Sequence, residues 1–377
     1  MIKVGTDFSG IGSPEAALKR LNIPHHNVFA CDIDKYAEKS FLELNKPDKF
    51  YKDITTRDYK EVPQLDLYVA GFPCQSFSLA GKRGGFNDTR GTLFYNVAEF
   101  IKVNQPECFI LENVKGLLSH DSGKTYQTIT DVLTNGGGTL NGQIGMDTID
   151  DGLGYHVYTK VLNTKDYGIP QNRERIFIVG FKYYRDFNFP IKLPLLNKLK
   201  DILEQDVNDK YYLSQKMIEG FFNHKERHKE KGTDCEYIKV HSLYPRSSKT
   251  GKGGTGHLSK QDGTTYCLDT GNNQAIELSY KYEKEIKQSI NQDIATCIDA
   301  SYYKGFGVRQ GKCRQVVKSE NNIRRLTPLE CWRLQGFTDE EFYKAQKVNS
   351  DTQLYKQAGN SITVNVMVEI LRKIYLK

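Results

Sequence analysis

The amino-acid sequence predicts an α/β fold with a mostly parallel sheet, followed by a smaller and less regular domain. Up to about residue 180, short apolar runs alternate with helical patterns, and such alternation forms a parallel sheet covered by helices on both faces. The alternation stops over 181–322, a stretch rich in Lys, Tyr, Gly and Asn, and helical patterns return afterwards. We therefore expect a first domain over 1–180, a second over 181–322, and a segment over 323–377 that returns to the first domain.

The individual elements follow from apolar periodicity and from helix-start signals. The expected strands are Ile2–Phe8, Val28–Cys31, a short third strand before Asp53, Leu65–Ala70, Cys108–Leu111, His156–Leu162 and Arg175–Val179. The expected helices of the first domain are Pro14–Leu21, Lys35–Leu44, Leu93–Val103 and Tyr126–Leu133. Near the C-terminus, Thr327 and Pro328 have the residue types of an N-cap and a first helical position. Ser361 is expected to cap an apolar last helix. So apolar a helix must pack on another element, and we expect that element to be the first domain.

Composition narrows the class of protein. The chain has 377 residues, of which 38% are hydrophobic and 26% charged, and no apolar run approaches the ~18 residues of a membrane helix. Its eight cysteines are scattered without a CxxC pair, which suits a reducing compartment and argues against zinc. His224 and His228 lie four apart with no third ligand nearby. We therefore expect a cytoplasmic protein with no membrane segment and no metal site.

The net charge of +7 fits a polyanionic partner, although many proteins without one are equally basic. Residues 241–260 and 301–318 contain several Lys and Arg and no acidic residue. On charge alone, two solvated loops explain these stretches as well as phosphate contacts do. Gly123-Lys124-Thr125 ends like a phosphate-binding loop, but Leu118 stands where its first glycine is needed.

Three strand ends carry groups suited to a nucleoside ligand. Phe8-Ser9-Gly10-Ile11-Gly12 forms a glycine-rich turn between strand and helix, where backbone can approach a ligand closely. Asp32 and Asp34 follow the second strand; one can accept from ribose hydroxyls while the other caps a helix. Asp53-Ile54 follows the third strand and can receive an adenine amino group. Each signal alone is more often structural than functional.

The next two strands end in reactive groups. Pro73-Cys74-Gln75 puts a thiol at the carboxyl edge of the sheet, and a long polar loop follows it. Isolated cysteines are usually inert, but a cysteine in such a turn below a flexible loop has the setting of a nucleophile under a lid. Glu112 closes the neighbouring apolar strand and would face the same site, as a buried acid whose pKa burial would raise.

Together these segments resemble the C5 cytosine-specific DNA methyltransferase family, with six motifs in order over both ends of the chain. Phe8–Gly12 matches the cofactor loop, Pro73-Cys74-Gln75 the nucleophile motif and Glu112-Asn113-Val114 the base-binding motif. The remaining matches are Gln171-Asn172-Arg173-Glu174-Arg175, Arg325–Phe337 and Gln357-Ala358-Gly359-Asn360-Ser361. The resemblance implies a Rossmann-like catalytic domain that uses S-adenosylmethionine, and a target-recognition domain over 181–322.

The resemblance also implies residue roles. Cys74 would attack carbon 6 of a flipped cytosine, Glu112 would bind ring nitrogen 3, and Arg173 and Arg175 would activate the thiol, with Arg175 on the base carbonyl. The implied cofactor-binding residues are Phe8, Ser9, Gly10, Ile11, Gly12, Asp32, Ile33, Asp53, Ile54, Pro73, Leu93, Asn360, Ser361 and Ile362. The implied DNA-binding residues are Gln75, Ser76, Ser78, Lys82, Arg83, Arg90 and Thr296. Ile33, Asp32 and Lys52 depart from the family's commonest residues. These departures put the affinity for the cofactor in doubt, but every catalytic position matches the family.

Alternatives to a DNA methyltransferase remain open at this level. A transfer-RNA methyltransferase of the same fold tends to have a second proline where this chain has Phe72, and a smaller recognition region. An amino-methyltransferase needs an Asn/Asp-Pro-Pro-aromatic motif, which the chain lacks. A regulator built on an inactive enzyme would have lost Cys74 or Glu112. We therefore expect a monomeric enzyme acting on double-stranded DNA, from a restriction-modification system with a cognate endonuclease or from a phage.

Overall fold

The computed structural model describes residues 1–73, 93–134, 152–212 and 322–376, together with four short strands at 239–242, 258–260, 274–277 and 316–319. The chain divides into two compact units. Unit 1 comprises 1–163, 174–191 and 364–377, and unit 2 comprises 164–173 and 192–363. The C-terminal helix therefore belongs to the same unit as the N-terminal strands.

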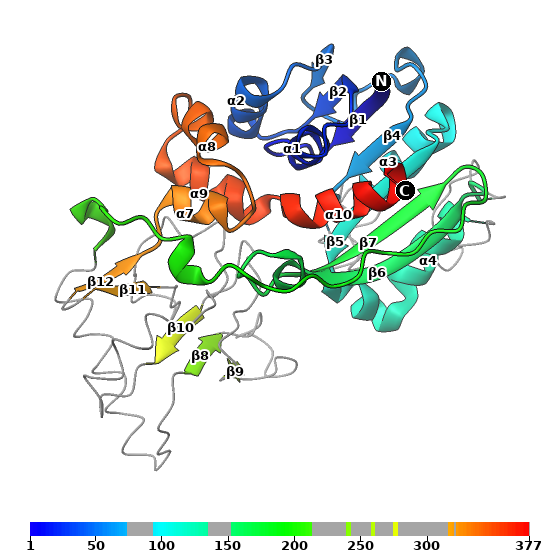
Figure 1. The fold of residues 1–377 in the computed structure, drawn as a ribbon. Helices are drawn as coiled ribbons and strands as arrows, with labels where there is room; N and C mark the ends of the chain where they lie inside the picture. The colour runs from blue at the N-terminus through cyan, green and yellow to red at the C-terminus, as the bar shows by residue number, and fades with distance from the viewer. Residues whose placement is uncertain are drawn as a thin grey trace, which may run out of the picture. The chain divides into compact units, whose positions relative to one another are not determined.

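Unit 1 is built on a sheet of seven strands in the order β3-β2-β1-β4-β5-β7-β6 (Figure 1). Five neighbouring strands from β3 to β5 run parallel, while β7 is antiparallel to both β5 and β6. The strands are β1 Ile2–Asp7, β2 His25–Cys31, β3 Lys49–Tyr51, β4 Leu67–Ala70, β5 Cys108–Val114, β6 His156–Asn163 and β7 Glu174–Phe181. The predicted α/β class with a mostly parallel sheet is confirmed, and β5 runs three residues beyond its expected end at Leu111.

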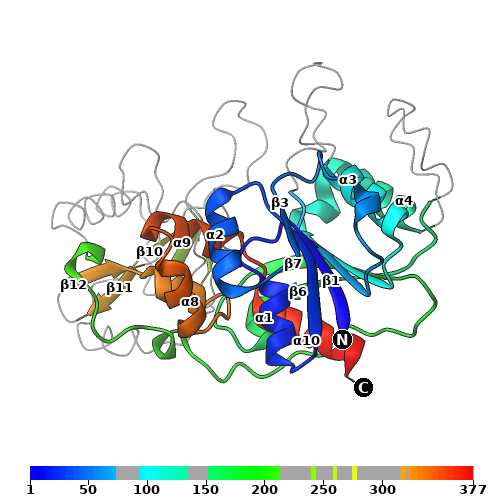
Figure 2. The same cartoon turned by 90° about the horizontal axis from the view of Figure 1, so that it is seen from above.

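Helices cover both faces of this sheet, so the strands can be apolar on both sides. Figure 2 shows α1 and α10 on one face and α3 and α4 on the other. The helices are α1 Ser13–Arg20, α2 Lys35–Leu44, α3 Leu93–Asn104, α4 Lys124–Leu133 and α10 Val364–Tyr375. The core between sheet and helices is rich in aromatic residues, including Phe29, Tyr68, Phe100 and Phe109, none more than 1% exposed.

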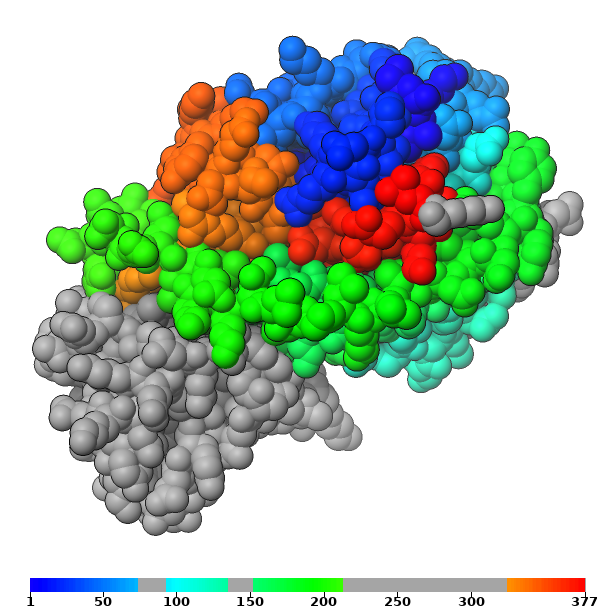
Figure 3. Space-filling model, in the orientation of Figure 1, coloured from blue at the N-terminus to red at the C-terminus, as the bar shows by residue number. Residues whose placement is uncertain are grey.

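The last helix, α10, joins unit 1 through an apolar stripe. Val364, Met367, Ile370, Leu371 and Ile374 recur at helical spacing and are buried. Figure 3 shows the red residues of α10 lying against the blue residues of α1.

The expectation that Ser361 caps α10 is wrong. Ser361 is the C-cap of the preceding helix, α9 Asp351–Asn360, and its amide donates to the Ala358 carbonyl. The hydroxyl of Ser361 donates to the Ile362 carbonyl, and α10 begins only at Val364. A serine before an apolar run has the composition of an N-cap, but here two residues separate it from the first turn.

The described part of unit 2 contains three further helices and two small sheets. The helices are α7 Pro328–Arg333, α8 Asp339–Gln346 and α9, and the strands are β8 Lys239–Ser242, β9 Leu258–Lys260, β10 Gln274–Glu277, β11 Val316–Ser319 and β12 Asn322–Arg325. The predicted start of α7 is confirmed: Thr327 Oγ accepts the Glu330 amide, and Glu330 Oε2 accepts the Thr327 amide. Short 3₁₀ turns connect other elements, among them Tyr59–Glu61 in unit 1.

Candidate active site

The described site residues of unit 1 lie along one edge of its sheet. Strands β3, β2, β1, β4 and β5 are neighbours, run parallel and end at Tyr51, Cys31, Asp7, Ala70 and Val114. The predicted groups follow these ends or close the strand itself. Ligands of open α/β sheets bind outside the carboxyl ends of the strands, so the topology gathers distant segments into one candidate site.

The turn after β1 requires its glycines. Gly10 and Gly12 have φ values of 54° and 82°, a region that side chains with a Cβ disfavour. A Cβ added to Gly12 would also lie 2.4 Å from Asn45 Nδ2. Phe8 has a φ of 54° despite its Cβ, and backbone strain of this kind concentrates at functional sites.

Ser9 ties the ends of β1 and β2 together. Its amide donates to the Cys31 carbonyl at 2.9 Å, and its hydroxyl accepts from the Cys31 amide at 2.8 Å. The same hydroxyl lies 2.8 Å from the Thr6 carbonyl and 3.0 Å from Thr6 Oγ. Ser9 is buried and both its amide and its hydroxyl are hydrogen-bonded. Its structural role is therefore to hold the backbone of Phe8–Gly12 in place.

Asp32 connects the second strand end to the glycine turn. Its Oδ2 accepts from the Gly10 amide at 2.8 Å, and its Oδ1 accepts from the Asp34 amide at 2.9 Å. Burial raises the pKa of Asp32, and these two amide bonds oppose the rise. Of the two aspartates, Asp34 is the one that caps α2, accepting from the Tyr36 amide. Ile33 between them is 82% exposed, an unusual degree for isoleucine beside a candidate ligand site.

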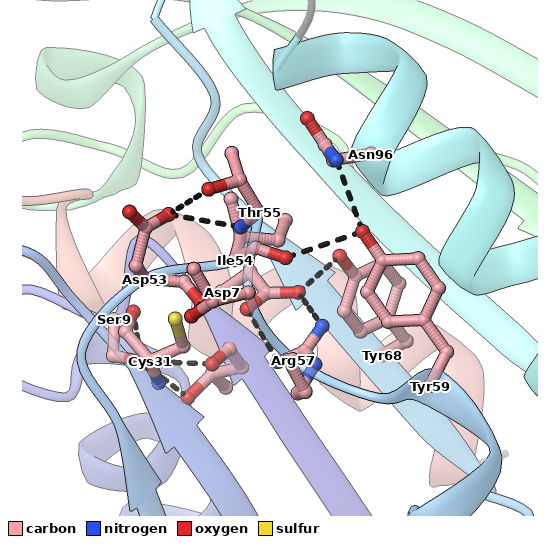
Figure 4. Close-up of polar contacts among 12 residues, drawn as sticks. Asp7, Ser9, Cys31, Asp53, Ile54, Thr55, Arg57, Tyr59, Tyr68 and Asn96 are labelled. Atoms are coloured by element: carbon pink, nitrogen blue, oxygen red, sulfur yellow. Dashed lines mark hydrogen bonds and ion pairs between the residues drawn. The ribbon is translucent and has the colours of Figure 1, made fainter.

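Asp53 and Ile54 sit in a turn that its own hydrogen bonds keep compact (Figure 4). Asp53 Oδ1 accepts from both the amide and the hydroxyl of Thr55 at 2.8 Å. The carbonyl of Ile54 accepts from the Tyr59 hydroxyl at 3.2 Å, and that hydroxyl accepts from Asn96 Nδ2 of α3 at 3.1 Å. The Ile54 side chain is buried.

Beneath this edge lies a buried ion pair that the sequence pattern does not predict. Arg57 donates to both carboxylate oxygens of Asp7, at 2.8 and 2.7 Å, and the Tyr68 hydroxyl donates to Asp7 Oδ2 at 2.7 Å (Figure 4). Both charged side chains are 0% exposed. An arginine in a short polar stretch carries no local signal of burial. The position of Asp7 at the end of an apolar strand does indicate that its side chain can be buried.

A second group missed from sequence is Glu15, in the first turn of α1. It is fully buried, its Oε1 accepts from Thr6 Oγ at 3.2 Å, and no described residue bonds its Oε2. Burial raises the pKa of Glu15 from an ordinary 4.5 to about 7, despite opposing contributions from its own amide, Thr6 and Lys19. An acidic residue in a first helical turn is normally exposed, so its pattern predicted nothing unusual.

The fourth and fifth strand ends are fastened to each other. Asn113 Nδ2 donates to the Phe72 carbonyl at 2.9 Å, and β4 pairs with β5 so that Ala70 faces Leu111. The bond holds the backbone two residues before Cys74 beside the end of β5. Pro73 is exposed next to Phe72, and Leu93 is the half-buried first residue of α3.

Glu112 and Arg175 meet at this end of β5. Arg175 Nε lies 3.1 Å from Glu112 Oε1, with the two side chains 10% and 11% exposed. Because β7 runs antiparallel to β5, the beginning of β7 reaches the carboxyl end of β5. The predicted acid and one predicted arginine are thus brought together.

Arg173 belongs to unit 2 and makes different contacts. Its guanidinium donates to the carbonyls of Gly359 and Ser361, at 3.2 and 2.7 Å, and is buried. It thereby holds the end of α9 and the turn that follows, where the predicted cofactor residues Asn360, Ser361 and Ile362 lie. Asn360 is exposed at the end of α9, and Ser361 is buried. The contacts of Arg173 within unit 2 are those of a residue that shapes a turn.

Several predicted residues lie outside the described part of the chain. They are the nucleophile Cys74, the recognition residue Thr296, and the loop residues Gln75, Ser76, Ser78, Lys82, Arg83 and Arg90. Among the described residues, no group of three or more His, Cys, Asp and Glu side chains could hold a metal ion. No described helix is long and apolar enough to cross a bilayer.

Comparison with known proteins gives one family. The family model described as C-5 cytosine-specific DNA methylase matches residues 3–376. Type II methyltransferase M.HpaII of Haemophilus parainfluenzae is 36% identical, covering 98% of this chain and 88% of its own length. Orphan methyltransferase M.SPRI of Bacillus phage SPR is 31% identical, covering 99% of this chain and 97% of its own length.

Solved structures agree on the fold. The crystal structure of S. pombe Dnmt2 methyltransferase matches with a TM-score of 0.64 and covers 100% of both chains at 17% sequence identity. A Spodoptera frugiperda DNMT2 mutant matches with a TM-score of 0.58 at 18% identity, again over both chains in full. At these identities the likeness concerns the fold alone.

Proposed function

The chain belongs to the C-5 cytosine-specific DNA methylase family, and on that basis we propose that Cys74 and Glu112 methylate a cytosine flipped out of duplex DNA. The observation that carries the proposal is the fastening of the two strand ends. Asn113 Nδ2 donates to the Phe72 carbonyl, so the backbone leading into Cys74 starts beside β5, which carries Glu112 two residues before its end. A thiol and a carboxylate on adjoining strand ends are the pair of groups that the reaction needs.

The edge from β3 to β1 has the chemistry of a site for S-adenosylmethionine. Each oxygen of the Asp32 carboxylate accepts one amide and retains a lone pair that a ribose hydroxyl can use. Asp53 Oδ2 accepts no hydrogen bond from the described residues, and the exposed Ile33 offers an apolar surface to a base. The family and the fold imply this cofactor, which when bound supplies an electrophilic methyl group. Phe8–Gly12, Asp32, Ile33, Asp53, Ile54, Pro73 and Leu93 would hold it, and the family resemblance adds Asn360, Ser361 and Ile362.

Carbon 5 of cytosine is too weak a nucleophile to take a methyl group unaided. Addition of the Cys74 thiolate to carbon 6 breaks the 5,6 double bond, and the electron pair makes carbon 5 an enamine carbon. A free cysteine has a pKa of about 8.5, so nearby positive charge is needed to populate the thiolate. After methylation, carbon 5 loses its proton to a base or water, and the returning electron pair expels Cys74.

Glu112 and Arg175 would polarise the ring during the addition. A proton or hydrogen bond from the Glu112 carboxyl to ring nitrogen 3 accepts the charge that the thiolate delivers, and the same carboxyl can accept from the exocyclic amine. Arg175, beside Glu112, can donate to the base carbonyl and contributes positive charge. Arg173 would act at one remove, by shaping the turn before α10.

A stacked base cannot reach these groups, so the target must leave the duplex, at a cost of a few kcal/mol. Gln75, Ser76, Ser78, Lys82, Arg83 and Arg90 would close over the flipped base and contact phosphates. The stretch 181–322, with Thr296, would read the sequence from the major groove. We propose a monomer acting in the cytoplasm, as a restriction-modification or phage orphan enzyme like the relatives it resembles.

The proposal is tested by transfer of labelled methyl groups from S-adenosylmethionine to mixed-sequence duplex DNA, with Cys74→Ala beside the wild type and transfer RNA as a competing substrate. The expected result is alkali-stable label in DNA that disappears with Cys74→Ala, at a site that bisulfite sequencing locates. Label only in RNA, or label that survives the loss of Cys74, would overturn the proposal.

A further inference from the structure

Arg57 is an unusual residue to find in the interior of unit 1. Its side chain is 0% exposed, as is that of its partner Asp7. Charged groups are buried at a large desolvation cost, and a buried pair is generally no more stabilising than apolar residues of the same size. The pair therefore calls for an explanation other than stability, such as fixing one arrangement of the chain.

The surroundings of Arg57 hold its guanidinium in a single position. The guanidinium carbon, Cζ, lies 4.2 Å from the ring centre of Phe29 and 4.6 Å from that of Phe100. The ring centres of Tyr51 and Tyr59 lie 5.2 and 5.4 Å from it. Aromatic faces attract a desolvated cation at such distances. The two terminal nitrogens then point at the two oxygens of Asp7. A planar fork held by rings and matched to a carboxylate allows little rotation.

The position of this pair in the chain gives it a consequence for the sheet edge. Asp7 is the last residue of β1 and directly precedes the turn Phe8–Gly12. Arg57 lies three residues after Ile54, in the turn that follows β3. The ion pair thus connects the last residue of β1, directly before the glycine turn, to the turn after β3, and β2 separates these two strands in the sheet.

A second connection runs to the same turn from the other side. Tyr59 packs edge-on against Phe100 at 5.7 Å and donates to the Ile54 carbonyl, while Asn96 of α3 donates to the Tyr59 hydroxyl. Figure 4 shows the bonds of Arg57 to Asp7 and the bond of the Tyr59 hydroxyl to Ile54 in the segment that carries Asp53 and Ile54. The turn has only its short internal bonds otherwise.

We propose that Arg57, with Tyr59 as its second anchor, is a positioning residue for the cofactor: it holds the Asp53–Ile54 turn at a set distance from the glycine turn after β1. This role rests on the proposed binding of S-adenosylmethionine along this edge. Arg57 itself would touch no ligand. Loss of either anchor leaves the binding groups present but lets the turn move. Affinity for the cofactor falls while the chemistry at Cys74 and Glu112 is unaltered.

The test uses Tyr59→Phe and Arg57→Lys in the full chain, with Tyr155→Phe as the matched control. Tyr155 also donates a hydroxyl to a backbone carbonyl, that of Pro106 at 2.8 Å, but before the start of β5, at the opposite edge of the sheet. Lysine keeps the charge at position 57 and loses the fork. Calorimetry measures the Kd for S-adenosylmethionine without DNA, and steady-state kinetics separate kcat from the two KM values.

We expect Tyr59→Phe to raise the Kd and the KM for S-adenosylmethionine by about tenfold, the effect of one well-placed hydrogen bond. Arg57→Lys should raise them further, and kcat at saturating cofactor and KM for DNA should stay within about twofold. Tyr155→Phe should lower the melting temperature at unchanged Kd. If Arg57→Lys does not fold, the Kd of Tyr59→Phe for S-adenosylmethionine decides whether the positioning role holds.

Two outcomes separate the failure of this inference from that of the proposed function. A wild-type protein that binds no S-adenosylmethionine overturns both. A wild type that binds and methylates, beside a Tyr59→Phe variant with unchanged Kd, overturns the positioning role alone. Equal weakening by Tyr155→Phe would also overturn it, because the effect would then be general loosening of unit 1.

Discussion

Arg175 reaches Glu112 diagonally across two antiparallel strands. In the register of β5 and β7, Arg175 faces Val114 and Glu112 faces Phe177, so the paired side chains lie two positions apart on the same face. Long side chains bridge such diagonal neighbours. The antiparallel direction of β7 matters here: in a parallel strand, a residue at the beginning would lie at the opposite edge from Glu112.

The role of Glu112 is tested by Glu112→Gln, which keeps size and hydrogen-bonding capacity but cannot deliver a proton in the same way. We expect kcat to fall by about 10² to 10⁴, the range for loss of a general acid. The Kd for S-adenosylmethionine should not change. Single-turnover methylation of a short duplex measures the chemical step, and a rate within a few-fold of wild type would refute the assignment.

Coupling between Glu112 and Arg175 is tested by a double-mutant cycle with Arg175→Met. Each single change leaves a nearly buried charge or amide without its partner, so the second change should cost less than it does alone. We expect a coupling free energy of about 1–3 kcal/mol in the transition-state term. Strictly additive losses in kcat/KM would show that the two side chains act separately.

Asp53→Asn should weaken cofactor binding with little effect on folding, because Asp53 is incompletely buried and bonds only within its own turn. We expect the Kd for S-adenosylmethionine to rise by about tenfold, the value of a hydrogen bond to a charged group. Asp48→Asn is the control, since Asp48 is 60% exposed and pairs with His26 at the amino ends of β2 and β3, away from the carboxyl ends of the strands. Calorimetry on the three proteins compares them directly.

Gly12→Ala should destabilise unit 1. Its φ of 82° disfavours alanine, and the new methyl group would lie 2.4 Å from Asn45 Nδ2. The expected loss in the free energy of unfolding is about 1–3 kcal/mol. Gly116→Ala is the matched control because a Cβ there meets only Val114 Cγ2, at 3.9 Å. Urea unfolding of both variants should show a shifted midpoint for Gly12→Ala alone.

Glu15 predicts a specific dependence of stability on pH. Its folded pKa of about 7 lies above the ordinary 4.5, so the protonated form is favoured by folding, and this stabilisation is complete below pH 4.5 and lost as the pH rises to 7. Relative to Glu15→Gln, the wild type should lose about 3 kcal/mol of unfolding free energy between pH 4.5 and pH 8. Urea midpoints at several pH values measure the difference, and parallel curves for the two proteins would contradict it.

Much of the candidate site was open to prediction because it depends on local pattern. The glycine turn, the Asp34 cap and the Thr327–Pro328 helix start each use residue types whose backbone preferences act within a few positions. The order of strand ends then placed Asp32, Asp53 and Glu112 at one edge. Element boundaries are harder to predict, and residue type alone misplaces Ser361 because a cap is also defined by φ and ψ.

The sequence by itself determined the α/β class, the family and the groups offered at the carboxyl edge of the sheet, since these follow from periodicity and from motifs read along the chain. Only the tertiary structure decided that Arg57 forms a buried ion pair with Asp7, that Glu15 is fully buried, and that Arg175 forms an ion pair with Glu112. The physical reason is that burial and ion pairing are made by residues distant in sequence. Their free energy depends on which strands become neighbours and in which direction they run.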